Sequence, residues 1–175
     1  WSSDVCSSDL QCVKGGDIAR MADWGLVASM QPCHLPGDIA MADRHWPRAR
    51  AWAYPMRSMA TAGVLLAFGS DVPVETMDPL VGIRAAVRRQ DDQGQPAGGW
   101  FAGERLTVGQ ALGAYTAGAA YAGGRGGRLG VLREGLPADV AVLSGPLSMI
   151  ATRDWRALRV VATVLGGRLV YGRRG

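Results

Sequence analysis

The sequence predicts an α/β fold in which parallel strands covered by helices come first and a small β-rich segment follows. The first observation is the run VLLAFGSDVP at residues 64–73, where a continuous apolar stretch stops at polar residues. Such a run is typical of a strand buried on both faces. The second is that helical patterns alternate with short apolar runs as far as about residue 124. The third is a pair of β-type runs around Gly166 and Gly167, which indicates a hairpin.

The elements before residue 54 are one helix and one strand. Asp17 is suited to cap a short amphipathic helix, and Gly25 is suited to the position just after its end. Residues 26–30 are apolar and predict a short strand. Residues 35–53 contain Pro, Asp and Gly, and we expect them to form a loop.

Residues 54–124 predict three helices and one strand. Residues 54–63 have proline near the start and glycine at the end, as a short helix does, and residues 64–68 form the buried strand. Asp78, followed by proline, opens a second helix. Thr107 and Gln110 have the spacing of a capping box, which starts the third. The glycine-rich stretch that follows ends the helical part.

The remaining residues change to a strand-like period. Residues 140–143 predict a strand, with Asp139 fixing its entry, and residues 160–164 and 169–171 predict the two arms of the hairpin. A β/α portion therefore precedes a β-rich tail, and the boundary lies near residue 124.

Composition indicates a globular chain of one domain or slightly more. The chain has 175 residues, 48% of them hydrophobic, and no stretch approaches the ~20 apolar residues of a membrane helix. The net charge is +4, but the arginines are scattered and no aromatic residues interleave with them, which argues against nucleic acid. Arg84, Arg88 and Arg89 have helical spacing, and we expect a solvated face there.

The three cysteines, Cys6, Cys12 and Cys33, are odd in number and irregularly spaced. They describe neither a disulfide framework nor a zinc knuckle. We expect Cys33 to be a small buried apolar residue.

Residues 1–10, WSSDVCSSDL, are polar and lack both a hydrophobic period and the features of a signal peptide. They resemble translated adapter sequence, so we expect them to be non-native and do not use them to predict the fold. The native protein is then expected to be longer at its N-terminus. The cytoplasm is the default location, and export stays open because a native leader would be missing.

Two residues are candidates for chemistry because each follows a strand at its carboxyl end, the edge where α/β enzymes place their active sites. Asp71 is the first, although an aspartate after Gly-Ser also commonly turns the chain or caps the next segment. His34 is the second, as a hydrogen-bond donor to substrate or as a loop histidine bonded to backbone. Ser70 lacks the glycines of a serine-nucleophile elbow, and His45 lies among charged residues that favour a surface role.

Five separated motifs resemble, in order, the late part of metal-dependent amidohydrolases of the amidohydrolase-3 (YtcJ-like) group. The motifs are QPCHLPGD at 31–38, YPMRSMATAG at 54–63, FGSDVPVETMDPLVGIRAAVRR at 68–89, LTVGQALGAYTAGAAYAG at 106–123 and LGVLREGLPADVAVLS at 129–144. In the last motif Leu136 and Pro137 stand where a lysine is frequent before the Ala-Asp pair, which is a structural position.

The resemblance implies the C-terminal part of a (β/α)8 TIM-type barrel and a small β-sandwich built from both chain ends. Residues 11–124 would hold about strands seven and eight of the barrel, and residues 125–175 would belong to the composite β-rich domain. The missing N-terminal part of the same polypeptide would then be a partner. Of the family's metal ligands, only the strand-eight aspartate maps onto this chain, at Asp71.

The resemblance also implies an activity, the hydrolysis of a non-peptide carbon–nitrogen bond of a small amide or formamide. A divalent metal, zinc above all, would activate water, and Asp71 would be both ligand and proton carrier. His34 and Ser70 would bind substrate, with Ser70 also supporting the Asp71 loop. Because about three or four ligands are needed, we expect this chain alone to be inactive.

Two alternatives from other classes stay open. A non-catalytic α/β binding module predicts no metal uptake at any chain length. An arginine-dependent polyanion binder predicts binding with a steep salt dependence.

Overall fold

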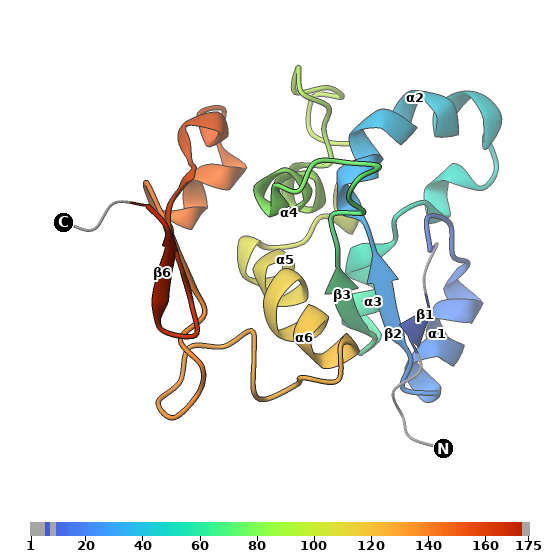
Figure 1. The fold of residues 1–175 in the computed structure, drawn as a ribbon. Coiled ribbons are helices and arrows are strands. Elements are labelled where there is room, and N and C mark those ends of the chain that lie inside the picture. The colour runs from blue at the N-terminus through green and yellow to red at the C-terminus, as the bar shows by residue number, and fades with distance from the viewer. Residues whose placement is uncertain (1–5, 8–9, 173–175) are drawn as a thin grey trace.

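The computed structural model describes residues 6–7 and 10–172 and confirms the predicted α/β class, with two sheets of three strands each. The first sheet is parallel, with the order β1-β2-β3, and the second is antiparallel, with the order β4-β5-β6. Helices α5 (Val108–Gly113) and α6 (Ala119–Ala122) lie between the two sheets (Figure 1). The strands are β1 (Cys6–Ser7), β2 (Val27–Met30), β3 (Leu65–Phe68), β4 (Val140–Leu143), β5 (Val160–Leu165) and β6 (Arg168–Tyr171).

The register of the parallel sheet brings two chain segments together at one edge. Met30 of β2 is aligned with Phe68 of β3, and the Gly69 amide continues the ladder by donating to the Met30 carbonyl at 3.1 Å. Parallel strands end at the same edge of a sheet. The residues after Met30 and those after Phe68 therefore lie side by side.

Strand β1 differs from the sequence expectation for residues 1–10. Cys6 pairs with Val27 and Ser7 with Ala28, so these two residues extend the parallel sheet. The fold prediction left out residues 1–10, and this pairing adds two of them to the parallel sheet. A parallel ladder uses backbone groups, so a side-chain pattern alone does not reveal such a short pairing.

The predicted helices are present, and their caps follow the sequence signals. The Asp78 carboxylate accepts a hydrogen bond from the Leu80 amide at 2.9 Å at the start of α4, and Thr107 and Gln110 form the capping box of α5. The helices are α1 (Gly15–Asp23), α2 (Leu35–His45), α3 (Met56–Thr61), α4 (Pro79–Arg88), α5 (Val108–Gly113) and α6 (Ala119–Ala122), with a π-helical turn η4 (Ala114–Gly118) joining the last two.

Helix α2 corrects the predicted loop over residues 35–53. Pro36 lies in its first turn, where a missing amide hydrogen costs nothing. Leu35 and Ala42 are fully buried on one face of α2, and Ile39 packs against the core between them. Pro36, Gly37 and Asp38, which suggested a loop, lie in the first turn of α2.

The core lies around the parallel sheet and includes three methionines, Met30, Met56 and Met59, each 2% exposed or less. The predicted solvated face of arginines is wrong for two of its members. Arg84 is 7% exposed and Arg89 is fully buried. Helix α4 lies against η1 (Pro32–His34) and η5 (Leu147–Ala151), so the side of α4 expected to face water is covered.

Arg89 follows α4 in a left-handed conformation, with φ 52°. Its guanidinium donates to three backbone carbonyls, those of Trp100 at 2.6 Å, Tyr54 at 2.8 Å and Ala53 at 3.1 Å. Burial lowers the pKa of Arg89 to about 10. A single buried cation thus ties the start of α3 to the segment after α4.

The antiparallel sheet is more open. The β5–β6 hairpin turns at Gly166 and Gly167, both with positive φ, as the sequence predicts. Asp139 accepts a hydrogen bond from the Gly166 amide at 2.7 Å, which joins the entry of β4 to that turn. Within the part of the chain that the structure describes, no helix has the length and apolar character needed to cross a membrane.

Candidate functional site

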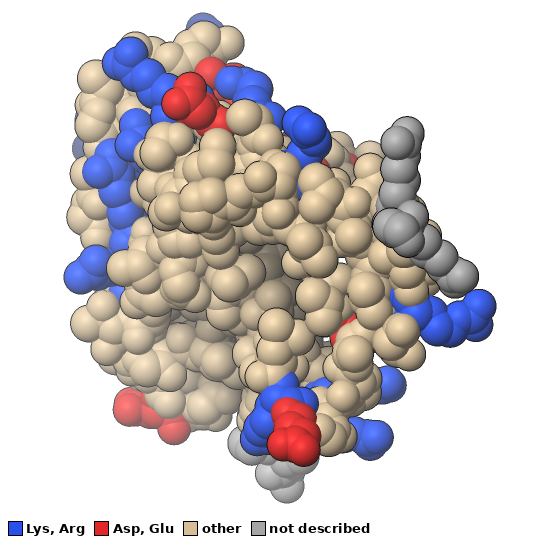
Figure 2. Space-filling model, turned by 90° about the vertical axis from the view of Figure 1, so that its left-hand side faces the viewer, with Lys and Arg blue, Asp and Glu red and all other residues tan. Residues whose placement is uncertain are grey.

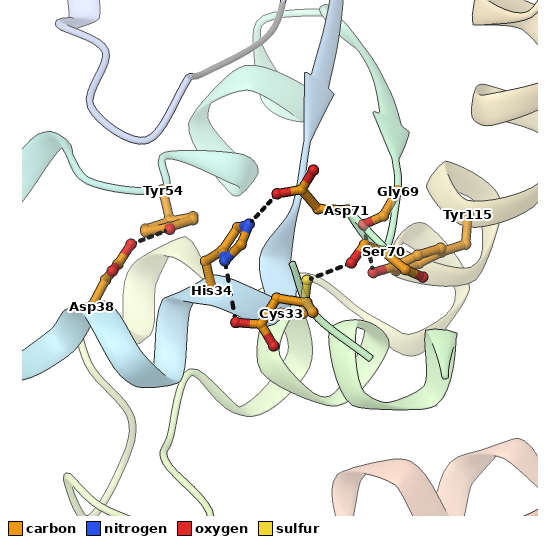
Figure 3. Close-up of polar contacts among 9 residues, drawn as sticks. Cys33, His34, Asp38, Tyr54, Gly69, Ser70, Asp71 and Tyr115 are labelled. Carbon is orange, nitrogen blue, oxygen red and sulfur yellow. Dashed lines mark hydrogen bonds and ion pairs between the residues drawn. The ribbon is translucent and has the colours of Figure 1, made fainter. Parts of the chain in front are cut away.

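The candidate site lies at the carboxyl edge of β2 and β3, where His34 and Asp71 meet (Figure 3). His34 ends the η1 turn after β2, and Asp71 follows β3 in a left-handed conformation, with φ 55°. The distance from His34 Nε2 to Asp71 Oδ2 is 2.9 Å. The two residues singled out in the sequence are therefore brought into direct contact.

Glu75 is a third member of the site, which the sequence analysis missed. Its Oε1 lies 3.3 Å from His34 Nδ1, so each ring nitrogen of His34 faces a carboxylate. The turn after Asp71 places Glu75 there, because the amides of Val74 and Glu75 both donate to the Asp71 carbonyl, at 2.8 and 3.3 Å. The sequence signal that could have identified Glu75 is its position four residues after Asp71.

The site is open to solvent on its carboxylate side. The side chains of His34, Asp71 and Glu75 are 19%, 44% and 38% exposed. Exposed ion pairs of this kind stabilise a fold by about 0–1 kcal/mol, so they are weak structural elements. The arrangement leaves the carboxylates accessible to a ligand that approaches the edge of the sheet.

The loop that carries Asp71 is held by two hydrogen bonds to its main chain, one from Tyr115 and one from Cys33 (Figure 3). The Tyr115 hydroxyl donates to the Gly69 carbonyl at 3.3 Å, and the Cys33 thiol donates to the Ser70 carbonyl at 3.6 Å. Ser70 therefore takes part in the loop through its main chain. A Cβ at Gly82 would lie 1.8 Å from the Tyr115 hydroxyl, so glycine at that position lets Tyr115 reach the loop.

Cys33 and Tyr115 are held in their neutral forms. Burial raises the pKa of the Cys33 thiol, and the nearby Glu75 carboxylate adds to that effect. Burial likewise raises the pKa of Tyr115. Cys33 is 7% exposed, which confirms the prediction of a small buried apolar residue.

A second polar pair lies beside His34. The Tyr54 hydroxyl donates to Asp38 Oδ2 at 2.5 Å, and burial, together with this hydrogen bond, raises the pKa of Tyr54. Tyr54 is 1% exposed and has φ 51°. His45, in contrast, is exposed at the end of α2, as predicted for a surface role.

The described residues do not form a complete metal site, and Asp71 is the residue for which a ligand role is predicted. Across residues 6–7 and 10–172, no group of three or more His, Cys, Asp or Glu residues could hold a metal ion. The donor set nevertheless fits a single ligand, because Asp71 Oδ2 meets His34 while Oδ1 has no hydrogen-bond partner among those same residues. A carboxylate with one free oxygen can coordinate a divalent cation once other donors are present.

Comparisons with known proteins agree with this fold. A profile described as "Amidohydrolase family" matches residues 7–171. The chain is 32% identical over 155 residues to YtcJ of Bacillus subtilis, whose name describes an amidohydrolase, and 34% identical over 162 residues to an N-substituted formamide deformylase of Arthrobacter pascens. These alignments cover 88% and 91% of this chain but 29% of each relative, so the chain spans under a third of their length.

Solved structures extend the comparison to the barrel. A metal-dependent hydrolase from Pyrococcus furiosus superposes with a TM-score of 0.64 at 28% identity, covering 76% of this chain and 26% of that protein. The atrazine chlorohydrolase TrzN from Arthrobacter aurescens TC1, complexed with zinc, gives 0.64 at 22% identity over 98% of this chain and 37% of its own. The neighbours are TIM-barrel enzymes, which confirms the predicted fold class of a late barrel part with a small β segment. The chain belongs to the amidohydrolase family, whose profile covers nearly all of it.

Proposed function

We propose that this chain supplies part of the active site of a metal-dependent enzyme that hydrolyses a non-peptide carbon–nitrogen bond of a small amide or formamide. The observation that carries the proposal is the 2.9 Å contact of His34 with Asp71 at the carboxyl edge of two parallel strands. In barrel enzymes that edge holds the active site.

The substrate class and the metal rest on the comparisons. One relative, whose alignment covers 91% of this chain, is named an N-substituted formamide deformylase. That name favours a formamide-type bond as the substrate bond. Zinc is bound in a structural neighbour of the same fold, which favours zinc as the divalent metal. The free oxygen of Asp71 is the ligand that this chain would offer.

Asp71 acts as ligand and proton carrier in this proposal. A divalent metal ion, when bound, supplies an acidic water molecule and polarises the scissile carbonyl. The Asp71 carboxylate then takes a proton from the attacking water and gives it to the leaving amine. Its partial exposure suits this role, because the carboxylate can reach both the water and the leaving group.

His34 and Ser70 bind substrate, and Glu75 orients His34. Contact with Asp71 through Nε2 and with Glu75 through Nδ1 fixes the ring plane of His34 at the edge of the sheet. To stabilise the oxyanion that forms at the carbonyl, His34 Nε2 would exchange Asp71 for the substrate oxygen as its hydrogen-bond acceptor. Ser70 lies between the strand end and Asp71 and supports that loop.

The remaining ligands must come from other polypeptide segments, because the described residues offer no group of three. We therefore expect the 175-residue chain alone to show no turnover. In the complete polypeptide that carries these residues, 11–124 would form part of the barrel and 125–175 part of a β-rich domain.

The test is Asp71→Asn in that complete polypeptide. We expect zinc-dependent hydrolysis of an N-substituted formamide to fall by about 10²–10⁴-fold in kcat/KM, the range of a lost general acid–base group. Asp23→Asn is the matched control, because Asp23 is an exposed aspartate on α1.

Two results would contradict the proposal. Unchanged kcat/KM in Asp71→Asn would remove this carboxylate from the chemistry. Failure of the complete polypeptide to take up any divalent metal would favour the non-catalytic binding module instead.

A further inference from the structure

A polar cavity of about 510 Å³ lies between the last turns of α4, the segment 90–98 and the η6 turn (Trp155–Ala157). Four arginines line it, with one acidic residue. The lining charges are those of Arg84, Arg88, Arg153, Arg156 and Asp92. The proposed hydrolytic edge precedes the first turn of α4, so this cavity is a separate place in the fold.

The cavity carries an excess of positive charge. Arg156 is paired with Asp92 at 3.1 Å, while Arg88 donates to neutral oxygens, those of Gln90 and Ala151, both at 2.9 Å. Arg84 and Arg153 have no carboxylate partner among the described residues. Figure 2 shows blue basic atoms and red acidic atoms side by side at the top of one face, with further blue atoms at its left and right edges and at its foot.

Two buried donors on this wall lack acceptors. Arg84 and Trp155 are each 7% exposed, and the Arg84 guanidinium lies 4.7 Å from the Trp155 ring centroid. Neither Arg84 Nε nor Trp155 Nε1 has a hydrogen-bond partner in the part of the chain described. A buried cation without full compensation is costly. Burial also lowers the pKa of Arg84, with Arg156 and Arg88 acting in the same direction, while the carboxylates of Asp92 and Asp91 oppose this shift without cancelling it.

We propose that this cavity binds the phosphate group of a small molecule or free inorganic phosphate. Three of the arginines lack a carboxylate partner among these residues, and arginine is suited to oxyanions because its planar fork presents several N–H donors. A dianionic group offsets more of the excess charge than a carboxylate does. The volume lies in the range of small-molecule sites, which leaves room for an organic part beside the phosphate.

The test is isothermal titration calorimetry of the complete polypeptide with inorganic phosphate, glycerol 3-phosphate and succinate at constant ionic strength. Succinate carries its two negative charges on separate carboxylates, whereas a phosphate concentrates its charge on one group, so we expect both phosphates to bind more tightly than succinate. Tighter binding of glycerol 3-phosphate than of inorganic phosphate would identify the phosphate group of a small molecule as the ligand. The reverse order would identify free phosphate.

The variants are Arg84→Gln and Arg153→Gln. Each is expected to weaken phosphate binding by about tenfold, the loss of one charge-assisted hydrogen bond. Arg153 is exposed, so its replacement leaves the fold intact even where Arg84→Gln impairs folding. Arg48→Gln, which removes an exposed arginine outside the cavity, is the matched control and is expected to change the dissociation constant less than about twofold.

The proposal would be overturned by the absence of measurable phosphate binding to the unsubstituted protein. It would also be overturned by succinate binding as tightly as phosphate, or by an equal loss in Arg48→Gln and Arg153→Gln. None of these results depends on hydrolytic activity, so the cavity and the proposed active site are tested independently.

Discussion

The two sheets of this molecule have three strands each, yet they use their side chains differently. On β2 and β3 most residues are buried, including Val27, Ala28 and Met30, each 2% exposed or less. On β4, β5 and β6 no residue reaches that burial, and Leu165 and Val170 are 60% and 59% exposed.

The difference shows which sheet carries the stability of the described region. The parallel sheet is covered by helices, as sheets of this kind usually are. The antiparallel sheet is connected to the core mainly through the η5 and η6 turns, where Ile150 and Trp155 are buried. We infer that substitutions near β2 and β3 have large effects on stability, while equivalent substitutions near β4–β6 have small ones.

The largest effect is expected for Arg89→Met. The change removes the cation that binds three buried carbonyl oxygens and leaves those acceptors without their donors. We expect the free energy of unfolding of the complete polypeptide, measured in urea, to fall by about 3–5 kcal/mol. Arg168→Met on β6, where the arginine is exposed, is the control, with an expected change within about 0.5 kcal/mol. Similar losses in the two variants would contradict the comparison.

The same substitution, leucine to alanine, can be made near each sheet to compare its effect on the free energy of unfolding. Leu35 on α2 is fully buried and Leu165 on β5 is 60% exposed. We expect Leu35→Ala to lower the free energy of unfolding by about 2–5 kcal/mol through lost burial and a residual cavity. Leu165→Ala should cost less than about 1 kcal/mol. A larger loss for Leu165 in urea unfolding would show that another segment covers the antiparallel sheet.

High pH should destabilise the protein through buried tyrosines near the parallel sheet. The pKa of Tyr54 is raised by burial, so the folded state keeps its proton while the unfolded chain ionises near pH 10. The stabilising contribution is therefore complete below about pH 10 and is lost as pH rises above it. Tyr54→Phe should reduce this alkaline slope by up to about 1.4 kcal/mol per pH unit, measured by urea unfolding between about pH 9 and 11. An unchanged slope would contradict the protonated state assigned to Tyr54.

The smallest effect is expected within the antiparallel sheet itself. Asp139→Ala removes the acceptor of the Gly166 amide and should lower local stability by about 1 kcal/mol. Amide hydrogen exchange should then become faster in β4–β6 and stay unchanged in β2 and β3. Asp139→Asn keeps an oxygen acceptor and should have a smaller effect. Equal acceleration in both sheets would show that they open as one unit.

Much of the fold could be predicted from the sequence because the signals were local. The apolar run before Asp71, the Asp78-Pro79 helix start and the capping box at Thr107 each depend on neighbouring residues only. The missed helix α2 has a proline in its first turn, and Pro, Gly and Asp have two structural uses. Only the burial of Leu35 and Ala42 decides between helix and loop.

The rest depends on contacts between distant segments. Arg84 and Arg89 have the spacing of a solvated face, yet Trp155 and the carbonyl of Tyr54 cover them from elsewhere in the chain. The proximity of His34 and Asp71 followed from the expected strands, whereas the position of Glu75 depends on the turn that follows Asp71. The pattern of residue types after Asp71 does not predict the geometry of this turn.

The aligned register of β2 and β3 also constrains how the chain can tolerate insertions and deletions. His34 stands four positions beyond Met30 and Asp71 three positions beyond Phe68, and these two short counts alone determine whether the side chains meet. One extra residue in either connection would shift its side chain by about 3.3 Å, which exceeds a hydrogen bond's tolerance. Any redesign of this edge must therefore preserve the lengths of both connections as well as the residues themselves.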